Sequence, residues 1–104
     1  YFEDADYCRR ARICGYSVRC VPAARMWHKV SLSANRIRPT TRYAASWGRV
    51  QFYRKHPHGR LAALVHPYIW ARGLVVSVRD GLHGEWDLIG PLWRGVYDGY
   101  RDPL

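Results

Sequence analysis

The sequence predicts an α/β fragment, in which one helix and two short strands are followed by three mostly amphipathic helices. Apolar and small residues recur at helical spacing over residues 5–11, whereas residues 16–21 alternate with a period of two. From residue 61 onward, apolar residues return to spacings of three and four. The strands are expected within residues 1–38, and residues 39–104 are expected to be helical.

The first helix is expected to begin at Asp4 or Asp6 and to end near Cys14. A short carboxylate at a helix start accepts hydrogen bonds from free N–H groups of the first turn and faces the positive end of the helix dipole. Gly15 follows the helix, where a left-handed cap residue is preferred. Taken by itself, the acidic cluster is therefore a helix-capping group.

Two short strands are expected after this helix. Residues 16–21 alternate in polarity and end at Pro22, which cannot donate to a strand ladder. Residues 23–25 then form a turn, and residues 25–28 form a second extended piece that ends on His28. In a compact fold these elements bring His28 close to the acidic start of the helix.

Several spaced motifs in this region point to a known family. They are Phe2-Glu3-Asp4-Ala5-Asp6-Tyr7-Cys8-Arg9-Arg10-Ala11-Arg12, Gly15-Tyr16, Val21-Pro22, Ala24 and Trp27-His28-Lys29. Together they resemble the C-terminal part of the catalytic domain of family 2 glycosyltransferases, which have the GT-A fold, and are most similar to bacterial rhamnosyl- and galactofuranosyl-type members. The resemblance implies inverting transfer of a sugar from a nucleotide-sugar donor to a cell-surface polysaccharide or a lipid-linked acceptor.

The resemblance also assigns candidate site residues. Asp4 takes the position of the general base, with Glu3 beside it. His28 takes the position of a ligand to the divalent metal, Mg²⁺ or Mn²⁺, of the complete enzyme. A sugar hydroxyl is too weak an acid to ionise first, so a carboxylate must take its proton as the new bond forms. The alternative for His28 is a purely structural side chain.

The resemblance implies that the chain is a fragment. The nucleotide-binding half of such enzymes, with its Asp-x-Asp metal motif, would lie before Tyr1, and Met26 is the only methionine of the chain. We therefore expect the isolated chain to be inactive and to need this missing half as its partner. The residues that choose the donor sugar would also lie upstream.

The middle of the chain is strongly cationic. Residues 31–79 carry nine basic residues and no acidic residue, in a chain of net charge +9. Such a surface favours an anionic partner. In the expected loop of residues 31–39, Arg36 and Arg38 are candidates for contact with the diphosphate of a donor or a lipid-linked acceptor, and a solvated loop is the alternative.

A helix is expected from Pro39 to about His56, with proline in its first turn. The resembling family carries a Tyr-Tyr-x-x-Arg-Asn-Arg run in this helix. Residues 43–49 keep Tyr43 and Arg49 of that run, while Trp and Gly replace its central Arg-Asn pair. The resemblance makes Tyr43 and Arg49 candidate substrate contacts.

Residues 60–79 are the most apolar stretch of the chain, but they contain Pro67 and Arg72, which argue against a transmembrane helix. An amphipathic helix pair kinked at Pro67 is expected instead. Its apolar face would lie either on an anionic membrane surface or on the protein core. The tail, residues 81–104, continues as another helical stripe that is interrupted at Gly90.

The spacing of Cys8, Cys14 and Cys20 fits neither a zinc site nor a paired disulfide framework. Buried free thiols are therefore expected. Free thiols suit a reducing cytoplasm. We expect a cytoplasmic location, with a peripheral position on the inner face of the cell membrane as a further hypothesis.

Two other functional classes stay open at this point. A cationic block with interleaved aromatic residues is typical of a nucleic-acid-binding module, although no binding motif accompanies it. The aromatic residues concerned are Tyr43, Trp47, Phe52 and Tyr53. The apolar segments after residue 60 would also suit a non-catalytic membrane-surface adaptor.

Overall fold

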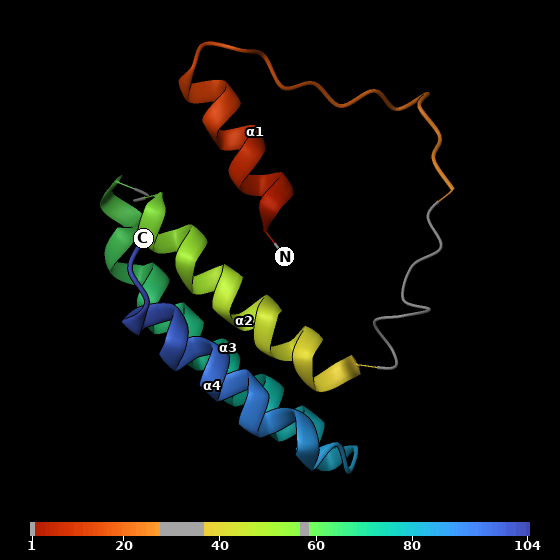
Figure 1. Cartoon of the computed structure of the whole chain (residues 1–104), viewed down its shortest axis with the longest axis vertical. Coiled ribbons are helices and arrows are strands. Elements are labelled where there is room, and N and C mark those ends of the chain that lie inside the picture. Colours follow the sequence, from red (N-terminus) through yellow and green to blue (C-terminus); the bar gives the residue numbers. More distant parts are fainter. Residues whose placement is uncertain (1, 28–36, 57–58) are drawn as a thin grey trace.

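A computed structural model describes residues 2–27, 37–56 and 59–104. In these ranges the chain forms the helices α1 (Glu3–Ile13), α2 (Arg38–Lys55), α3 (Ala62–Leu82) and α4 (Ile89–Arg101). Short 3₁₀ turns, η2 (Gly59–Leu61) and η3 (Trp86–Leu88), precede α3 and α4. Helices α2, α3 and α4 lie side by side as a bundle, and α1 is set against the C-terminal half of α2 (Figure 1).

The predicted α/β class is wrong for the part of the chain that the structure describes, which contains helices and no strand. Residues 16–27 run away from the helices as an irregular segment (Figure 1). A strand needs a neighbour to receive its backbone hydrogen bonds, and no other extended segment lies beside this one in the described ranges. The alternation of residues 16–21 is real, but the expected second strand also lacks a partner, and its end at His28 lies outside the described residues.

The start of α1 also differs from the prediction. Phe2, in a left-handed conformation with φ 72°, is the N-cap, and it makes no side-chain cap bond. The three carboxylates lie inside the first turn, where they face the positive end of the helix dipole without capping it. At the other end the prediction is confirmed, since Gly15 has φ 87°, a conformation that favours glycine.

The helices of the second half form close to where the sequence placed them. Helix α2 has Pro39 in its first turn, as expected. Helix α3 is one continuous element with Pro67 inside it, rather than a pair of helices. Gly90 and Pro91 begin α4 instead of interrupting a helix, because a proline in the first turn removes no intrahelical hydrogen bond. Among the described residues, no helix has both the length and the apolarity that crossing a bilayer requires.

The three cysteines are all free thiols, as the sequence predicts. The prediction that they are buried is wrong: Cys8 is half-buried, whereas Cys14 and Cys20 are exposed. Both exposed thiols follow α1 in the chain.

Among the described helices, α2 and α4 form the most extensive contact, and two glycines of α4 make it possible. A Cβ atom on Gly95 would lie 2.4 Å from the carbonyl oxygen of Tyr43, and one on Gly99 would lie 2.7 Å from Cβ of Val50. Glycines four residues apart leave a flat strip on a helix that admits a neighbouring backbone. The end of α4 is then fixed by Arg54 of α2, which donates to the carbonyl oxygens of Gly99 and Asp102 at 2.7 Å.

Helix α3 is held against α4 by aromatic side chains. The ring of Trp93 lies over Gly73, where an added Cβ would come within 2.8 Å of it, and its Nε1 donates to Ser77 at 3.0 Å. Trp70 packs beside Trp93 with ring centroids 5.4 Å apart, and its ring is stacked on that of Tyr100. Bulky rings thus occupy the α3–α4 contact, whereas Gly95 and Gly99 face α2.

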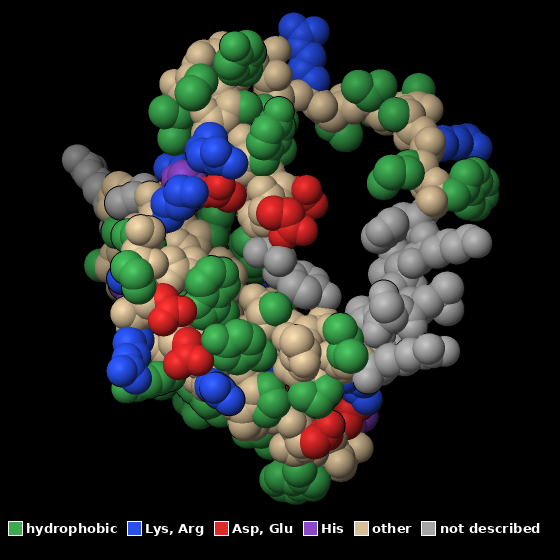
Figure 2. Space-filling model, viewed as in Figure 1, with side chains coloured by type: hydrophobic (Ala, Val, Ile, Leu, Met, Phe, Trp, Pro, Cys, Tyr) green, Lys and Arg blue, Asp and Glu red, His purple; other side chains and the backbone are tan. Residues whose placement is uncertain are grey.

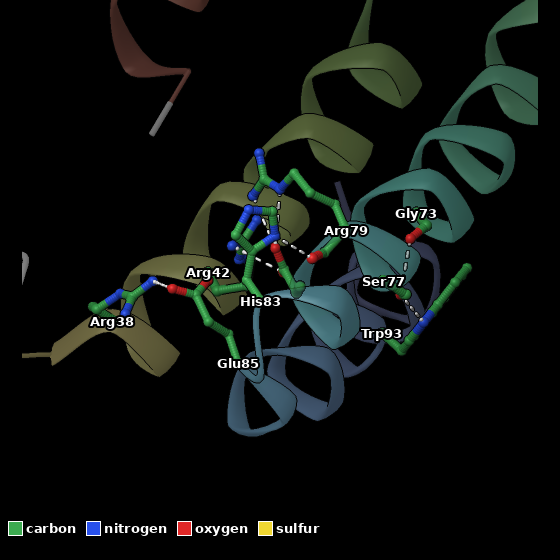
Figure 3. A network of polar contacts seen from close by, with 9 residues as sticks. Arg38, Arg42, Gly73, Ser77, Arg79, His83, Glu85 and Trp93 are labelled. Carbon is green, nitrogen blue, oxygen red and sulfur yellow. Dashed lines mark hydrogen bonds and ion pairs between the residues drawn. The ribbon is translucent and has the colours of Figure 1, made fainter.

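The resulting core is small. The buried apolar side chains are Val50, Ile69, Val76, Leu88, Leu92 and Val96. A carboxylate, Asp80 of α3, is also fully buried. It lies between Arg42 of α2, at 3.0 Å, and Arg79, at 2.8 Å (Figure 3). A buried carboxylate needs such cations, because leaving one unpaired costs several kcal/mol.

We predict that Gly95→Ala destabilises the bundle by about 1 to 3 kcal/mol, the range for overpacking a tight contact. The new methyl group would strike the backbone of α2, which cannot rotate out of the way as a side chain can. Urea unfolding followed by circular dichroism measures the effect.

Gly90→Ala is the matched control, because nothing lies within 4 Å of the added methyl group at that exposed position of the same helix. Its stability should stay close to that of the unchanged chain. Equal effects of the two substitutions would contradict the close α2–α4 contact.

Candidate functional site

The acidic start of α1 carries the residues with the most explicit chemistry. Glu3 and Asp4 are both exposed in the first turn. Asp4 makes no ion pair or hydrogen bond through its side chain in the described part of the chain. The structure therefore leaves the predicted base accessible to solvent and does not use it as a helix cap.

Asp6 has the opposite environment. Its carboxylate receives Lys55 Nζ at 3.0 Å and His56 Nε2 at 2.7 Å, both from the end of α2. Arg10 of α1 approaches the second carboxylate oxygen at 2.8 Å. We call Asp6, Arg10, Lys55 and His56 the α1–α2 latch. In Figure 2, red, blue and purple side chains lie together where α1 meets α2.

The latch changes the proton affinity of Asp6. Hydrogen bonds from Lys55 and His56 lower the pKa of Asp6 from 3.8 to about 2, and the charges of Lys55 and Arg10 act in the same direction. The carboxylate is therefore ionised near neutral pH and accepts the proton of His56 Nε2, which fixes that nitrogen as a donor. A carboxylate with so low a pKa is a poor general base.

Asp4 and Asp6 point to different sides of α1, since two positions in a helix differ by about 200°. Asp6 faces α2, and Asp4 faces away from it. The sequence offered both as helix starts, and the structure separates them into one exposed carboxylate and one structural carboxylate.

Arg49 is the predicted substrate contact that lies nearest to this acidic start. Its guanidinium is over the Phe2 ring, 5.3 Å from the centroid. The Phe2 ring in turn packs on Phe52 of α2, with centroids 5.6 Å apart. Burial lowers the pKa of Arg49, and the charge of Arg72 on α3 lowers it further.

The other predicted contacts are elsewhere. Arg38 forms an ion pair with Glu85, between the start of α2 and the turn before α4 (Figure 3). Tyr43 donates its hydroxyl to Asp98 of α4 at 3.0 Å. Arg38 and Arg49 are eleven residues apart on one helix, about 16 Å along its axis, so they cannot share one small ligand. Arg36 and His28 lie outside the described residues.

An open hollow of about 430 Å³ lies between the start of α1, the middle of α2 and the C-terminal residues. Its lining includes Glu3, Asp6 and Lys55, together with the rings of Trp47 and Phe52. A second open hollow, of about 700 Å³, lies between the starts of α2 and α4 and includes Tyr43 and Arg94. The predicted base region and Tyr43 therefore belong to different surfaces.

The described ranges contain no group of three or more His, Cys, Asp or Glu side chains that could hold a metal ion. The divalent metal therefore stays a prediction for the complete enzyme. The predicted ligand His28 lies beyond the described ranges.

The aromatic residues of α2 are engaged within the fold. Trp47 donates its Nε1 to Asp102 at 2.8 Å, and Tyr43 donates to Asp98. Phe52 is packed between Phe2 and His56. All these rings are half-buried, which weighs against α2 as a platform for stacking nucleic-acid bases.

Sequence reasoning missed the latch. His56 had no ligand spacing to mark it, and Asp6 was one of three acids with nothing to single it out. The two residues are fifty positions apart in the chain.

Comparisons with protein-family models, with curated proteins and with solved structures found no match to this chain.

We predict that the Asp6 carboxyl titrates near pH 2 and that Lys55→Met raises this pKa toward the ordinary value of 3.8. Because the folded pKa is the lower one, the latch stabilises α1 on α2 fully above about pH 4, and this stabilisation is lost as pH falls toward 2. The ¹³C shift of the carboxyl measures the pKa, and the NMR shifts of the Phe2 and Phe52 rings report the docking of α1.

Arg12→Met is the matched control, because it removes an exposed cation of α1 that forms no ion pair with Asp6. This substitution should leave the Asp6 midpoint near pH 2. An Asp6 midpoint that Lys55→Met does not change would show that Lys55 does not hold this carboxylate.

Proposed function

We propose that this chain is the base-bearing part of an inverting glycosyltransferase that uses a nucleotide-sugar donor. The resemblance of residues 2–29 to family 2 glycosyltransferases suggests the reaction. The observation that carries the proposal is the carboxylate of Asp4, which is exposed and has no partner among the described residues, two positions from the fully engaged carboxylate of Asp6.

In the proposed reaction an acceptor hydroxyl attacks the anomeric carbon of the donor sugar. The bond from that carbon to the nucleotide diphosphate breaks, and the configuration at the carbon inverts. Asp4 takes the hydroxyl proton during attack, from a distance of about 2.6 to 3.2 Å. The side of α1 that faces away from α2 is where the acceptor would approach.

The remaining α1 and α2 residues act as support in this proposal. The latch holds α1 to α2 and so fixes where the Asp4 carboxylate lies. Glu3 adds negative charge beside Asp4 in the same turn, and Arg49 provides a cation near the start of α1. The donor is bound by a part of the enzyme beyond these residues, and the proposed acceptor is a cell-surface glycan or a lipid-linked sugar on the cytoplasmic side of the membrane.

We predict that Asp4→Asn in the complete transferase lowers the turnover number at least about 100-fold, the lower range for loss of a general base. Binding of the nucleotide sugar should change little, because Asp4 acts on the acceptor. Initial-rate kinetics and calorimetric titration with the donor measure the two quantities.

Asp6→Asn is the comparison variant for the fold, because it removes the carboxylate of the latch. Asp6→Asn should loosen α1, visible as faster amide exchange, whereas Asp4→Asn should leave exchange unchanged. Substantial residual turnover of the Asp4→Asn enzyme would remove Asp4 from the role of base.

We also predict that residues 1–104 alone transfer no sugar and hydrolyse no nucleotide sugar. The reason is that the proposal assigns donor binding to a part of the enzyme outside these residues. Coupled detection of released nucleoside diphosphate tests this. Turnover by the isolated chain would contradict the assignment of donor binding to another part of the enzyme.

A further inference from the structure

Helix α3 is apolar on two opposite faces. One face packs on the bundle through the buried residues Ile69, Gly73, Val76 and Asp80. The other consists of large apolar side chains that are 52 to 83% exposed. These residues, Leu64, Tyr68, Val75, Val78 and Leu82, form what we call the α3 stripe. With the exposed Ala71, their spacing of four, three, four, three and four residues keeps them on one side of the helix.

The residues of the α3 stripe are contiguous, unlike the single exposed hydrophobic residues that are common on protein surfaces. Five large side chains in line along five turns form a continuous apolar surface, and Leu61, Leu74 and Trp86 extend it at 61 to 69% exposure. Contiguous apolar surfaces of this kind mark interaction sites.

Basic residues border the stripe. Arg72 lies one helical turn after Tyr68 of the stripe in α3, and its charge lowers the pKa of Arg49 on α2, so the two guanidinium groups are near each other. Neither arginine forms an ion pair in the described ranges. Two neighbouring guanidinium groups without an acidic partner attract an anion.

The stripe could be covered by a second copy of the chain or by a membrane, and the charge of α3 favours the membrane. Its single carboxylate, Asp80, is buried, so the exposed surface of the helix carries no acidic side chain. A second copy of the chain would bring a like-charged surface of the same +9 protein against this one. A bilayer with anionic headgroups offers an apolar layer for the stripe and negative charge for the arginines at its edge.

We propose that the α3 stripe lies in the interface of an anionic membrane, parallel to its surface, with Arg72 and Arg49 at the headgroups. Tyr68 and the half-exposed Trp70 are suited to the boundary between headgroups and acyl chains. The proposal does not depend on the glycosyltransferase assignment, because vesicle binding involves no sugar transfer.

Flotation of the 104-residue chain with vesicles tests the proposal. We expect binding to vesicles of phosphatidylcholine containing phosphatidylglycerol as one lipid in three, little binding to phosphatidylcholine alone, and weaker binding as salt is raised. The triple substitution Leu64→Gln, Val75→Gln and Leu82→Gln should weaken binding about tenfold or more. Arg72→Gln should weaken it about fivefold, the factor that corresponds to about 1 kcal/mol per basic residue near an anionic surface.

Matched controls use equally exposed residues away from α3. The triple substitution Ile13→Gln, Met26→Gln and Tyr97→Gln removes side chains that are 62 to 84% exposed, and Arg101→Gln removes a cation at the end of α4. Both should bind vesicles like the unchanged chain. Circular dichroism establishes that every variant keeps its helices.

Three outcomes would overturn the proposal. The first is equal flotation of the stripe variant and the unchanged chain. The second is equal binding to neutral and anionic vesicles. The third is a dimer in sedimentation velocity that the stripe substitutions dissociate, in a chain that does not float, since a second copy would then cover the stripe.

Discussion

The close approach of α4 to α2 is the contact on which the rest of the structure depends. Gly95 and Gly99 let α4 approach the backbone of α2 closely, because they carry no Cβ atom. Val50, Leu92 and Val96 can then be buried, although the core contains few large residues. In so small a core a single added methyl group at the glycines is a large fraction of the net stability.

The contact of α4 with α3 is made by aromatic rings, and it leaves one apolar face of α3 exposed. Trp70, Trp93 and Tyr100 fill the space between α3 and α4 and occupy one face of α3. The opposite face is left without a partner in the described ranges, although it is just as apolar. One side of α3 is therefore buried in the bundle, and the opposite side is exposed.

Helices with local signals could be predicted from the sequence, and contacts between distant residues could not. Pro39 and the apolar spacing after it are enough to place α2, and Gly15 is enough to end α1. The alternation of residues 16–21 predicted a strand, but strand formation depends on a partner that local sequence does not contain. In the same way, local sequence predicts a substrate contact for Arg38, because its actual partner, Glu85, lies 47 positions away in the chain. Asp4 and Asp6 are alike in sequence, and only the position of α2 distinguishes them.

The end of α4 has a consequence for how the chain folds. The last carbonyl groups of this helix accept hydrogen bonds from Arg54 and Gln51, both of α2, more than forty positions earlier. A helix terminated by a neighbour's side chains loses those caps whenever the neighbour is absent. Helices α2 and α4 are therefore expected to gain their order together, as one cooperative unit.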